Sequence, residues 1–280
     1  MKKISIITPC RNAERFIGET VESVLTQSAF TSGRAELEYL ICDGLSDDRT
    51  VAIAEAAAQG FRHGSVRVIS RADHGMYEAL AGGLRQASGD LCAYINAGDF
   101  YAKGAFDVVL DIFASGRAEW LTGLSVNYNE QSQLVGVSLP YRYRTRLFAC
   151  GAYDNRLLPF VQQESTFWST RLHRQLDFER LAGFRRAGDY YLWHRFAEIA
   201  ELKIVLSHLG GFRTHRGQLS QDLEAYRQEQ RQVVCGRKPG PLDLACAGFD
   251  ALMWKAPIAW KKKLNPQGLF VFSNVEQRWV

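Results

Sequence analysis

The sequence has no cysteine pair of the CxxC type and no apolar run long enough to cross a bilayer. Its six cysteines lie far apart, at positions 10, 42, 92, 150, 235 and 246. This spacing argues against a zinc or disulfide framework, and we expect Cys10, Cys42 and Cys92 to be buried thiols in a reducing compartment. No stretch reaches the ~18 uninterrupted apolar residues of a membrane span. The short apolar run after Lys3 also lacks the length and cleavage site of a signal peptide, so the expected location is the cytoplasm.

Two common phosphate-binding motifs and a strong net charge are missing as well. There is no GxxxxGK[ST], which excludes a P-loop, and no GxGxxG after the first expected strand, which excludes the dinucleotide fingerprint. The net charge is only +4, from 34 Lys and Arg against 30 Asp and Glu, so we expect no nucleic-acid partner. What the chain does have is 280 residues, 46% of them hydrophobic, which is enough for one α/β domain with an appendage.

Apolar runs and helical patterns alternate through the first hundred residues. Strands are predicted at 3–9, 36–44, 65–73 and 90–99, with helices at 14–28, 49–61 and 75–87. Near-continuous apolar strands separated by helices are typical of a parallel sheet that is covered on both faces. Right-handed crossovers then place the carboxyl ends of these strands along one edge, where ligands of open α/β sheets bind.

The second half of the chain is less regular. Strands are predicted at 118–128 and 202–212, and helices at 103–115 and 189–201. Beyond about residue 221 the pattern becomes that of a helical tail, interrupted by the break KPGP at 238–241.

Polar side chains follow each of the first four strands. They are the clusters Thr8-Pro9-Cys10-Arg11-Asn12, Asp43-Gly44, Arg71-Ala72-Asp73 and Asn96-Ala97-Gly98-Asp99. Any one of these aspartates alone would be explained by a turn or a helix cap. Because all four clusters meet at one edge, the sequence favours a nucleotide or phosphate site there.

Seven segments in this order resemble the family 2 glycosyltransferases of the GT-A fold, inverting enzymes of the bacterial cell-surface polysaccharide type. The resemblance covers roughly residues 3–220 and rests on ISIITPCRN, DGLSDDRT, DHGMYEAL, GDLCAYINAGD, QQESTFW, AGDYYLWHRF and FRTHRGQLS. It implies a Rossmann-like, mixed but mostly parallel sheet with helices on both faces, followed by a C-terminal helical tail. It also implies a nucleotide-sugar-binding half (1–100), an acceptor-binding half (101–220) and a helical extension (221–280).

The same resemblance implies transfer of a sugar from a nucleotide-diphosphate sugar, expected to be UDP-linked, to a hydroxyl of a glycan or lipid-linked acceptor. Thr8, Pro9 and Arg11 match the segment that lines the nucleotide pocket. Asp43 matches the acid that contacts the base or ribose, and Asp73 matches a further acid of the sugar-donor site.

Asp99 matches the last residue of the metal-binding acidic motif, and here the sequence departs from the family pattern. The usual motif carries two or three carboxylates, whereas this chain has Asn96 and Gly98 at the preceding positions. A single Asp can still bind Mn²⁺ or Mg²⁺ when the diphosphate and water supply further oxygens. Asn96 is expected to face the ribose or a bound water. His215 is a candidate second metal ligand, and Arg213 a candidate fork for the diphosphate.

Inverting transfer needs a general base that takes the proton of the acceptor hydroxyl. The resemblance favours Asp189, with Glu164 as the second candidate; Asp189 at a predicted helix start could also be an N-cap. The nearby aromatic residues Phe167, Trp168, Tyr190, Tyr191 and Trp193 are interpreted mainly as core. A non-catalytic protein that binds nucleotide sugars or glycans stays open as the alternative, because the acidic motif is depleted.

The tail contains a candidate membrane-surface segment at 242–263. Residues 235–263 hold six basic side chains and two acidic ones: Arg237, Lys238, Lys255, Lys261, Lys262 and Lys263 against Asp243 and Asp250. Met253, Trp254 and Trp260 are interleaved with them, as in an interfacial helix. Peripheral contact with the inner face of the cell membrane and simple packing on the main domain both remain open.

Overall fold

The computed structural model describes residues 2–215, 218 and 222–280, and its centre is an eight-stranded sheet of order β12-β10-β6-β9-β4-β1-β2-β3. Every neighbouring pair is parallel except those of β9, which runs antiparallel to β4 and to β6. The predicted mixed, mostly parallel sheet is therefore confirmed. The strands are β1 (Lys2–Cys10), β2 (Ala35–Asp43), β3 (Gly64–Ser70), β4 (Leu91–Tyr94), β6 (Trp120–Thr122), β9 (Thr166–Ser169), β10 (Lys203–Val205) and β12 (Leu269–Phe270).

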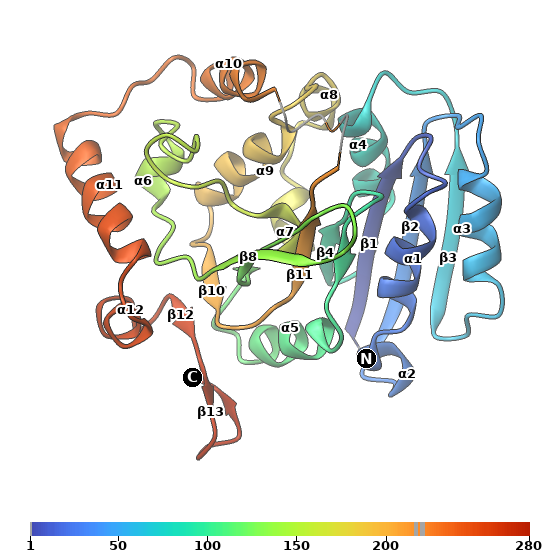
Figure 1. The fold of residues 1–280 in the computed structure, drawn as a ribbon, viewed down its shortest axis with the longest axis horizontal. Coiled ribbons are helices and arrows are strands. Elements are labelled where there is room, and N and C mark those ends of the chain that lie inside the picture. Colours follow the sequence, from blue (N-terminus) through green and yellow to red (C-terminus); the bar gives the residue numbers. More distant parts are fainter. Residues whose placement is uncertain (1, 216–217, 219–221) are drawn as a thin grey trace.

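Helices cover both faces of this sheet (Figure 1). One layer holds α1 (Ile17–Leu25), α2 (Ser28–Thr31), α3 (Thr50–Ala58) and α5 (Ala105–Ala114). The other layer holds α4 (Met76–Gln86), α6 (Thr145–Phe148), α7 (Thr170–His173), α8 (Phe178–Ala182) and α9 (Gly188–Ala197). In α1 the buried residues Ile17, Val21, Val24 and Leu25 recur at helical spacing, which gives the helix one apolar face for the sheet.

A second sheet of four strands, in the order β5-β11-β7-β8, lies beside the first. Its strands are β5 (Phe100–Tyr101), β7 (Ser125–Tyr128), β8 (Leu134–Ser138) and β11 (Gly210–Arg213). Each of the two strands predicted at 118–128 and 202–212 is in fact two strands, one in each sheet. Gly123 marks the first division, because a Cβ there would lie 2.7 Å from the backbone oxygen of Ser207. Backbone at that point can approach so closely only without a side chain.

The C-terminal region is helical, as predicted, but it also completes the main sheet. It forms α10 (Leu223–Val233), α11 (Pro241–Trp254) and α12 (Ile258–Leu264). Strand β12 then pairs in parallel with β10 at the sheet edge, and the hairpin β13 (Phe272–Ser273) and β14 (Arg278–Trp279) follows. Among the described residues, no helix is both long enough and apolar enough to pass through a bilayer. The division at residues 100 and 220 stays a prediction.

The core confirms two interpretations made from the sequence. Cys10, Cys42 and Cys92 are buried free thiols. The predicted core residues Phe167, Trp168, Tyr190, Tyr191 and Trp193 are buried as well, and Trp193 stacks on Trp120 with ring centroids 5.6 Å apart. Trp193 of α9 also contacts Trp168 of β9, with ring centroids 5.9 Å apart, so these rings pack α9 against the sheet.

Candidate active site

The first three strands end level with one another, as the sequence predicted. Cys10 is the register partner of Asp43, and Asp43 is the partner of Ser70. A cleft of about 1220 Å³ opens beyond these strand ends. Most of the predicted site residues line it together: Pro9, Arg11, Asp73, Asn96, Asp99, Glu164, Asp189 and His215.

Thr8 and Asp43 lie behind the cleft wall. The Thr8 hydroxyl is buried and shares a hydrogen bond of 2.9 Å with the Tyr39 hydroxyl. The Asp43 carboxylate is 1% exposed and accepts hydrogen bonds from the Ser46 backbone N–H at 3.1 Å and the Ser70 hydroxyl at 2.6 Å. Both of these bonds go to Oδ2, and Oδ1 accepts from the Ser46 hydroxyl. Asp43 therefore ties the loop after β2 to β3. The expected contact with a base or ribose stays a prediction.

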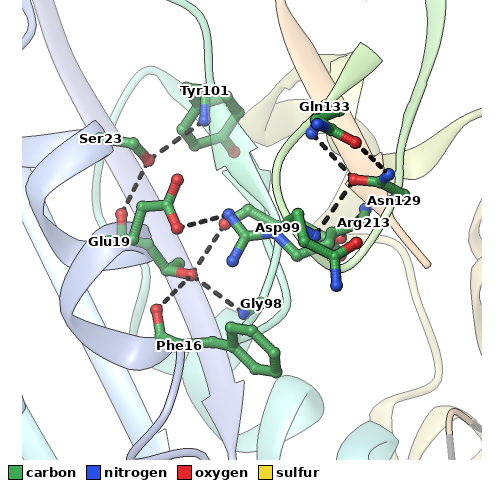
Figure 2. Close-up of polar contacts among 11 residues, drawn as sticks. Phe16, Glu19, Ser23, Gly98, Asp99, Tyr101, Asn129, Gln133 and Arg213 are labelled. Atoms are coloured by element: carbon green, nitrogen blue, oxygen red, sulfur yellow. Dashed lines mark hydrogen bonds and ion pairs between the residues drawn. The ribbon is translucent and has the colours of Figure 1, made fainter. Parts of the chain in front are cut away.

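The structure does not place the Arg213 guanidinium at the cleft. Arg213 is 2% exposed, forms an ion pair with Glu19, and lies between the rings of Phe16 and Phe100 at 5.1 Å from each centroid. Figure 2 shows this side chain directed at Glu19 on α1. The side chain therefore does not face the cleft, and the expected contact of its guanidinium with a diphosphate stays a prediction. What Arg213 offers the site is its backbone N–H, which donates to Asp99 Oδ1 at 2.8 Å.

Asp99 is buried at the end of a turn rather than at the end of a strand. Strand β4 stops at Tyr94, and Gly98 adopts φ +119°, a conformation that strains any residue with a side chain. The Thr20 hydroxyl donates to the Asp99 carbonyl at 2.7 Å. Thr20 and Arg213 therefore fix both the backbone and the carboxylate of Asp99.

Glu164, in the short 3₁₀ segment η1 (Gln163–Ser165), places a second buried carboxyl beside Asp99. Burial raises the pKa of both carboxyl groups, and the charge of Asp99 raises the pKa of Glu164 further. Two carboxylates that share one dry site cannot both ionise easily. The pair therefore carries about one negative charge when no cation is present.

The groups around Asp99 fit a divalent cation that is shared with a diphosphate. The buried Asn96 Oδ1 has no hydrogen-bond partner among the described residues, and a Cβ on Gly98 would lie 3.7 Å from His215 Nε2. Carboxylate and amide oxygens with an imidazole suit Mn²⁺ or Mg²⁺. Within the described parts of the chain, no group of three or more His, Cys, Asp or Glu could hold a metal. A cation here would need oxygens from its ligand.

Asp189 lies on another wall of the cleft, in the first turn of α9. The N-cap of α9 is Ala187, so the helix-cap interpretation of Asp189 does not describe this geometry. Its carboxylate accepts hydrogen bonds from the Tyr226 hydroxyl at 3.1 and 3.2 Å and from the Tyr77 hydroxyl at 3.3 Å. Burial raises the pKa of Asp189 to about 6, although these hydrogen bonds oppose the shift. A carboxylate with such a pKa is a suitable general base near neutral pH.

Helix α10 holds the start of α9 in place. The Glu229 carboxylate accepts from the backbone N–H groups of Arg185 at 3.0 Å, Arg186 at 2.8 Å and Ala187 at 2.8 Å. A Cβ on Gly188 would lie 2.4 Å from the Tyr77 ring, so glycine is required there. Sequence reasoning missed Tyr77, Tyr226 and Glu229. Tyr77 stands inside the motif DHGMYEAL, but nothing in the sequence indicates that α10 returns to this site.

Basic side chains border the cleft near Asp73. Arg11, Arg185 and Arg186 line it, and the Arg185 guanidinium donates to the His74 carbonyl. Asp73 accepts from the Gly75 N–H at 2.9 Å, and burial raises the pKa of its carboxyl group. Arg185 and Arg186 were not among the predicted residues. Among the described residues that line the cleft, they and Arg11 carry the guanidinium groups.

The fold and this cleft define an α/β protein with an open site at the strand ends and carboxylates on two of its walls. The family described as "Glycosyl transferase family 2" matches residues 5–175, and the chain belongs to this family. The chain is similar to the glycosyltransferase EpsJ of Bacillus subtilis, with 30% identity over 103 residues. That match covers 37% of this chain and 28% of EpsJ, so the chain corresponds to about a quarter of the length of this relative.

Two further similarities concern a teichoic acid protein and solved structures. The minor teichoic acid biosynthesis protein GgaB of Bacillus subtilis is 26% identical over 115 residues, which is 41% of this chain and 12% of GgaB. The structure of S. aureus TarS 1-349 with UDP-GlcNAc has a TM-score of 0.59 and 16% identity, covering 94% of this chain and 70% of that one. Glucosyl-3-phosphoglycerate synthase from Mycobacterium tuberculosis, with Mn²⁺, UDP and phosphoglyceric acid, has a TM-score of 0.54 and 19% identity, covering 86% and 80%. These structures confirm the fold class.

Proposed function

We propose that the chain is an inverting glycosyltransferase that moves a sugar from a nucleotide-diphosphate sugar to a hydroxyl of a glycan or lipid-linked acceptor. The observation that carries this proposal is a single cleft with Asp99 on one wall and the near-neutral carboxylate of Asp189 on another. A UDP-linked sugar is supported by the UDP-GlcNAc complex of TarS, and a role in cell-surface polysaccharide synthesis by the name of GgaB.

In this proposal the nucleotide sugar occupies the part of the cleft at the strand ends. Pro9, Asp73 and Asn96 line the nucleotide and ribose side, and Arg11 and Arg185 bind the diphosphate. Guanidinium groups suit this role because they form paired, charge-assisted hydrogen bonds with phosphate. Asp43 would then act from behind the wall by fixing the loop after β2.

Asp99, His215 and the carbonyl of Asn96 would hold Mn²⁺ or Mg²⁺. A cation there neutralises charge on the departing diphosphate. The protein's own part is to bring these ligands together, and the turn at Gly98 and the Arg213 N–H do so. When a cation binds Asp99, the proton that the two carboxyl groups share would reside on Glu164.

Asp189 is the favoured base, and the argument against Glu164 is electrostatic. Burial and the charge of Asp99 raise the pKa of Glu164 well above its usual range, which disfavours the ionised form that a general base needs. Two tyrosine hydroxyls orient Asp189, and in the part of the chain that the structure describes no carboxylate is hydrogen-bonded to it. It would take the proton of the acceptor hydroxyl as that oxygen attacks the anomeric carbon.

The variants Asp189→Asn and Glu164→Gln test this assignment. With a panel of nucleotide sugars and Mn²⁺, Asp189→Asn should still bind the nucleotide sugar, measured by thermal stabilisation, while transfer falls ~10²–10⁴-fold. Glu164→Gln should retain more transfer than Asp189→Asn. If Asp189→Asn transfers sugar at nearly the parent rate while Glu164→Gln does not, the base is Glu164.

A non-catalytic nucleotide-sugar or glycan-binding protein is the competing function, and its support is the single acid in the metal motif. Slow release of free nucleotide from the nucleotide sugar separates the two functions. An enzyme should release nucleotide in the presence of Mn²⁺, and Asp99→Ala should not. A protein that binds the nucleotide sugar and never hydrolyses or transfers it would support the competing function.

A further inference from the structure

Helix α11 is inverted: its apolar side chains face solvent and its two charged side chains face the protein. The exposed residues include Leu242 at 61%, Leu252 at 73% and Phe249 at 45%. Leu244, Ala245 and Gly248 are exposed on the same side of the helix. The exposed side of α11 thus carries no polar side chain, the reverse of the usual arrangement for a surface helix.

The inward side explains why the helix keeps this orientation. Asp250 is fully buried and accepts two hydrogen bonds from the Arg144 guanidinium, at 2.6 and 2.8 Å. Asp243 is 5% exposed and accepts from Arg146 Nε at 2.7 Å. Rotating α11 to hide its leucines would break both ion pairs and leave charges without partners, which is costly. The apolar face is therefore a fixed feature of the fold.

Helix α12 extends the same kind of surface. Ile258, Trp260 and Leu264 are 47%, 63% and 45% exposed. Two basic side chains that were expected to contact a membrane point into the protein instead. Lys261 Nζ donates to the carbonyls of Leu139 and Trp254. Lys262 Nζ donates to the carbonyls of Leu269 and Val280. Met253 is buried and Trp254 is partly buried, so of the three interleaved residues only Trp260 is exposed.

Four basic side chains in this region remain exposed, and no acidic one does. They are Arg237, Lys238, Lys255 and Lys263, whereas Asp243 and Asp250, the acids of residues 235–264, are paired inside. We name the apolar face of α11 and α12 together with these four cations the basic–apolar face. Figure 1 places α11 and α12 on the outer side of the molecule, at the opposite end of the view from α3.

We propose that the basic–apolar face binds the surface of a bilayer that contains anionic lipid. Leucine, phenylalanine and tryptophan side chains on a short helix, flanked by lysines, can enter the headgroup region while the cations meet lipid phosphates. The charge of the face argues against a second copy of this chain as the occupant. A symmetric dimer through this face would bring two patches of the same positive charge together, which is unfavourable. This inference does not depend on the proposed transferase activity.

Flotation with vesicles of phosphatidylcholine, with and without phosphatidylglycerol, tests the proposal on the full chain. Removal of residues 235–280 is unsuitable, because it would also remove strand β12 from the main sheet. The variant Leu252→Glu should bind vesicles roughly tenfold more weakly than the parent. The matched control is Val275→Glu, since Val275 is 95% exposed but lies in the β13–β14 connection, and it should bind like the parent.

A double variant tests the contribution of the exposed lysines to vesicle binding. Each cation near an anionic surface is worth roughly fivefold in binding, so Lys255→Gln with Lys263→Gln should weaken binding about thirtyfold. Raised salt should weaken the parent as well. The proposal is overturned if the parent does not bind vesicles that contain phosphatidylglycerol, or if Leu252→Glu and Val275→Glu bind equally. It is also overturned if sedimentation shows a parent dimer that Leu252→Glu dissolves while neither protein binds vesicles.

Discussion

Removing the Tyr226 hydroxyl should shift the pH dependence of transfer toward higher pH. Tyr226 donates to both oxygens of Asp189, at 3.1 and 3.2 Å, and its ring packs on Phe160 with centroids 4.8 Å apart. The variant Tyr226→Phe keeps the ring contact and removes only the hydroxyl. Because that hydrogen bond stabilises the ionised form of Asp189, its loss raises the pKa of the carboxyl group.

The size of the shift follows from the value of one hydrogen bond to a charged group. Such a bond contributes ~1.5–3 kcal/mol, and 1.36 kcal/mol corresponds to about one pKa unit. The Tyr77 hydroxyl remains at 3.3 Å and compensates in part, so we expect a rise of roughly one unit. The pKa of Asp189 in the parent is about 6. A base is active when ionised, so the parent loses activity below about pH 6 and the variant below about pH 7.

Measuring kcat/KM against pH checks this expectation, because that ratio reports the pKa values of the free enzyme. At pH 6 the variant should be about fivefold slower than the parent, and at pH 8 nearly equal to it. The matched control is Tyr191→Phe. Tyr191 is on α9, as Asp189 is, but its hydroxyl contacts the backbone of Asp177. The assignment of Asp189 as the general base would be refuted if kcat/KM of Tyr226→Phe and of the parent fell at the same acidic pH. It would also be refuted if the variant lost the same fraction of kcat/KM at every pH.

Three further outcomes follow from the same contacts. Asp99→Ala should abolish metal-dependent transfer while the circular dichroism spectrum is retained; full metal-dependent activity would contradict its role as the principal metal ligand. The raised pKa of Asp189 means that ionising it costs stability, so the parent loses stability as pH rises from about 4 to about 6. Asp189→Asn should accordingly have a higher Tm than the parent at pH 8 and a smaller advantage at pH 5; an advantage independent of pH would contradict this. Glu19→Gln leaves the buried Arg213 without its partner and, because Glu19 is half exposed, should cost about 2 kcal/mol in urea unfolding. Glu22→Gln is its control, and equal effects of the two would show that the Arg213 ion pair is not stabilising.

The part of the site that could be predicted from the sequence is the part that lies at strand ends. Three parallel strands with buried apolar residues must end at one edge, so Pro9, Arg11 and Asp73 were placed correctly at the cleft by periodicity and handedness alone. Asp189 was found through a motif at the start of a helix. Neither inference required knowledge of side-chain direction.

Side-chain direction is what the sequence could not supply. Arg213 is charged and stands in a motif between two site residues, yet its guanidinium is held away from the cleft by Glu19, nearly two hundred residues earlier in the chain. Lys261 is likewise drawn inward by the carbonyl of Leu139. In both cases a distant partner decides the orientation, and such pairing leaves no local pattern. The divided strands at 118–128 and 202–212 were missed because neither Gly123 in the first run nor the residues 206–209 in the second reveal a change of sheet.

The loss of acidic residues at positions 96 and 98 can be explained by the surroundings of Asp99. Asp99 and Glu164 are 3% and 5% exposed and already compete for one negative charge. A third carboxylate at position 96 would add another buried charge of the same sign, whereas the Asn96 amide offers an oxygen without that cost. At position 98, φ of +119° excludes an aspartate without strain. Glu164, brought in by η1, thus supplies beside Asp99 the second carboxyl group that the depleted motif lacks.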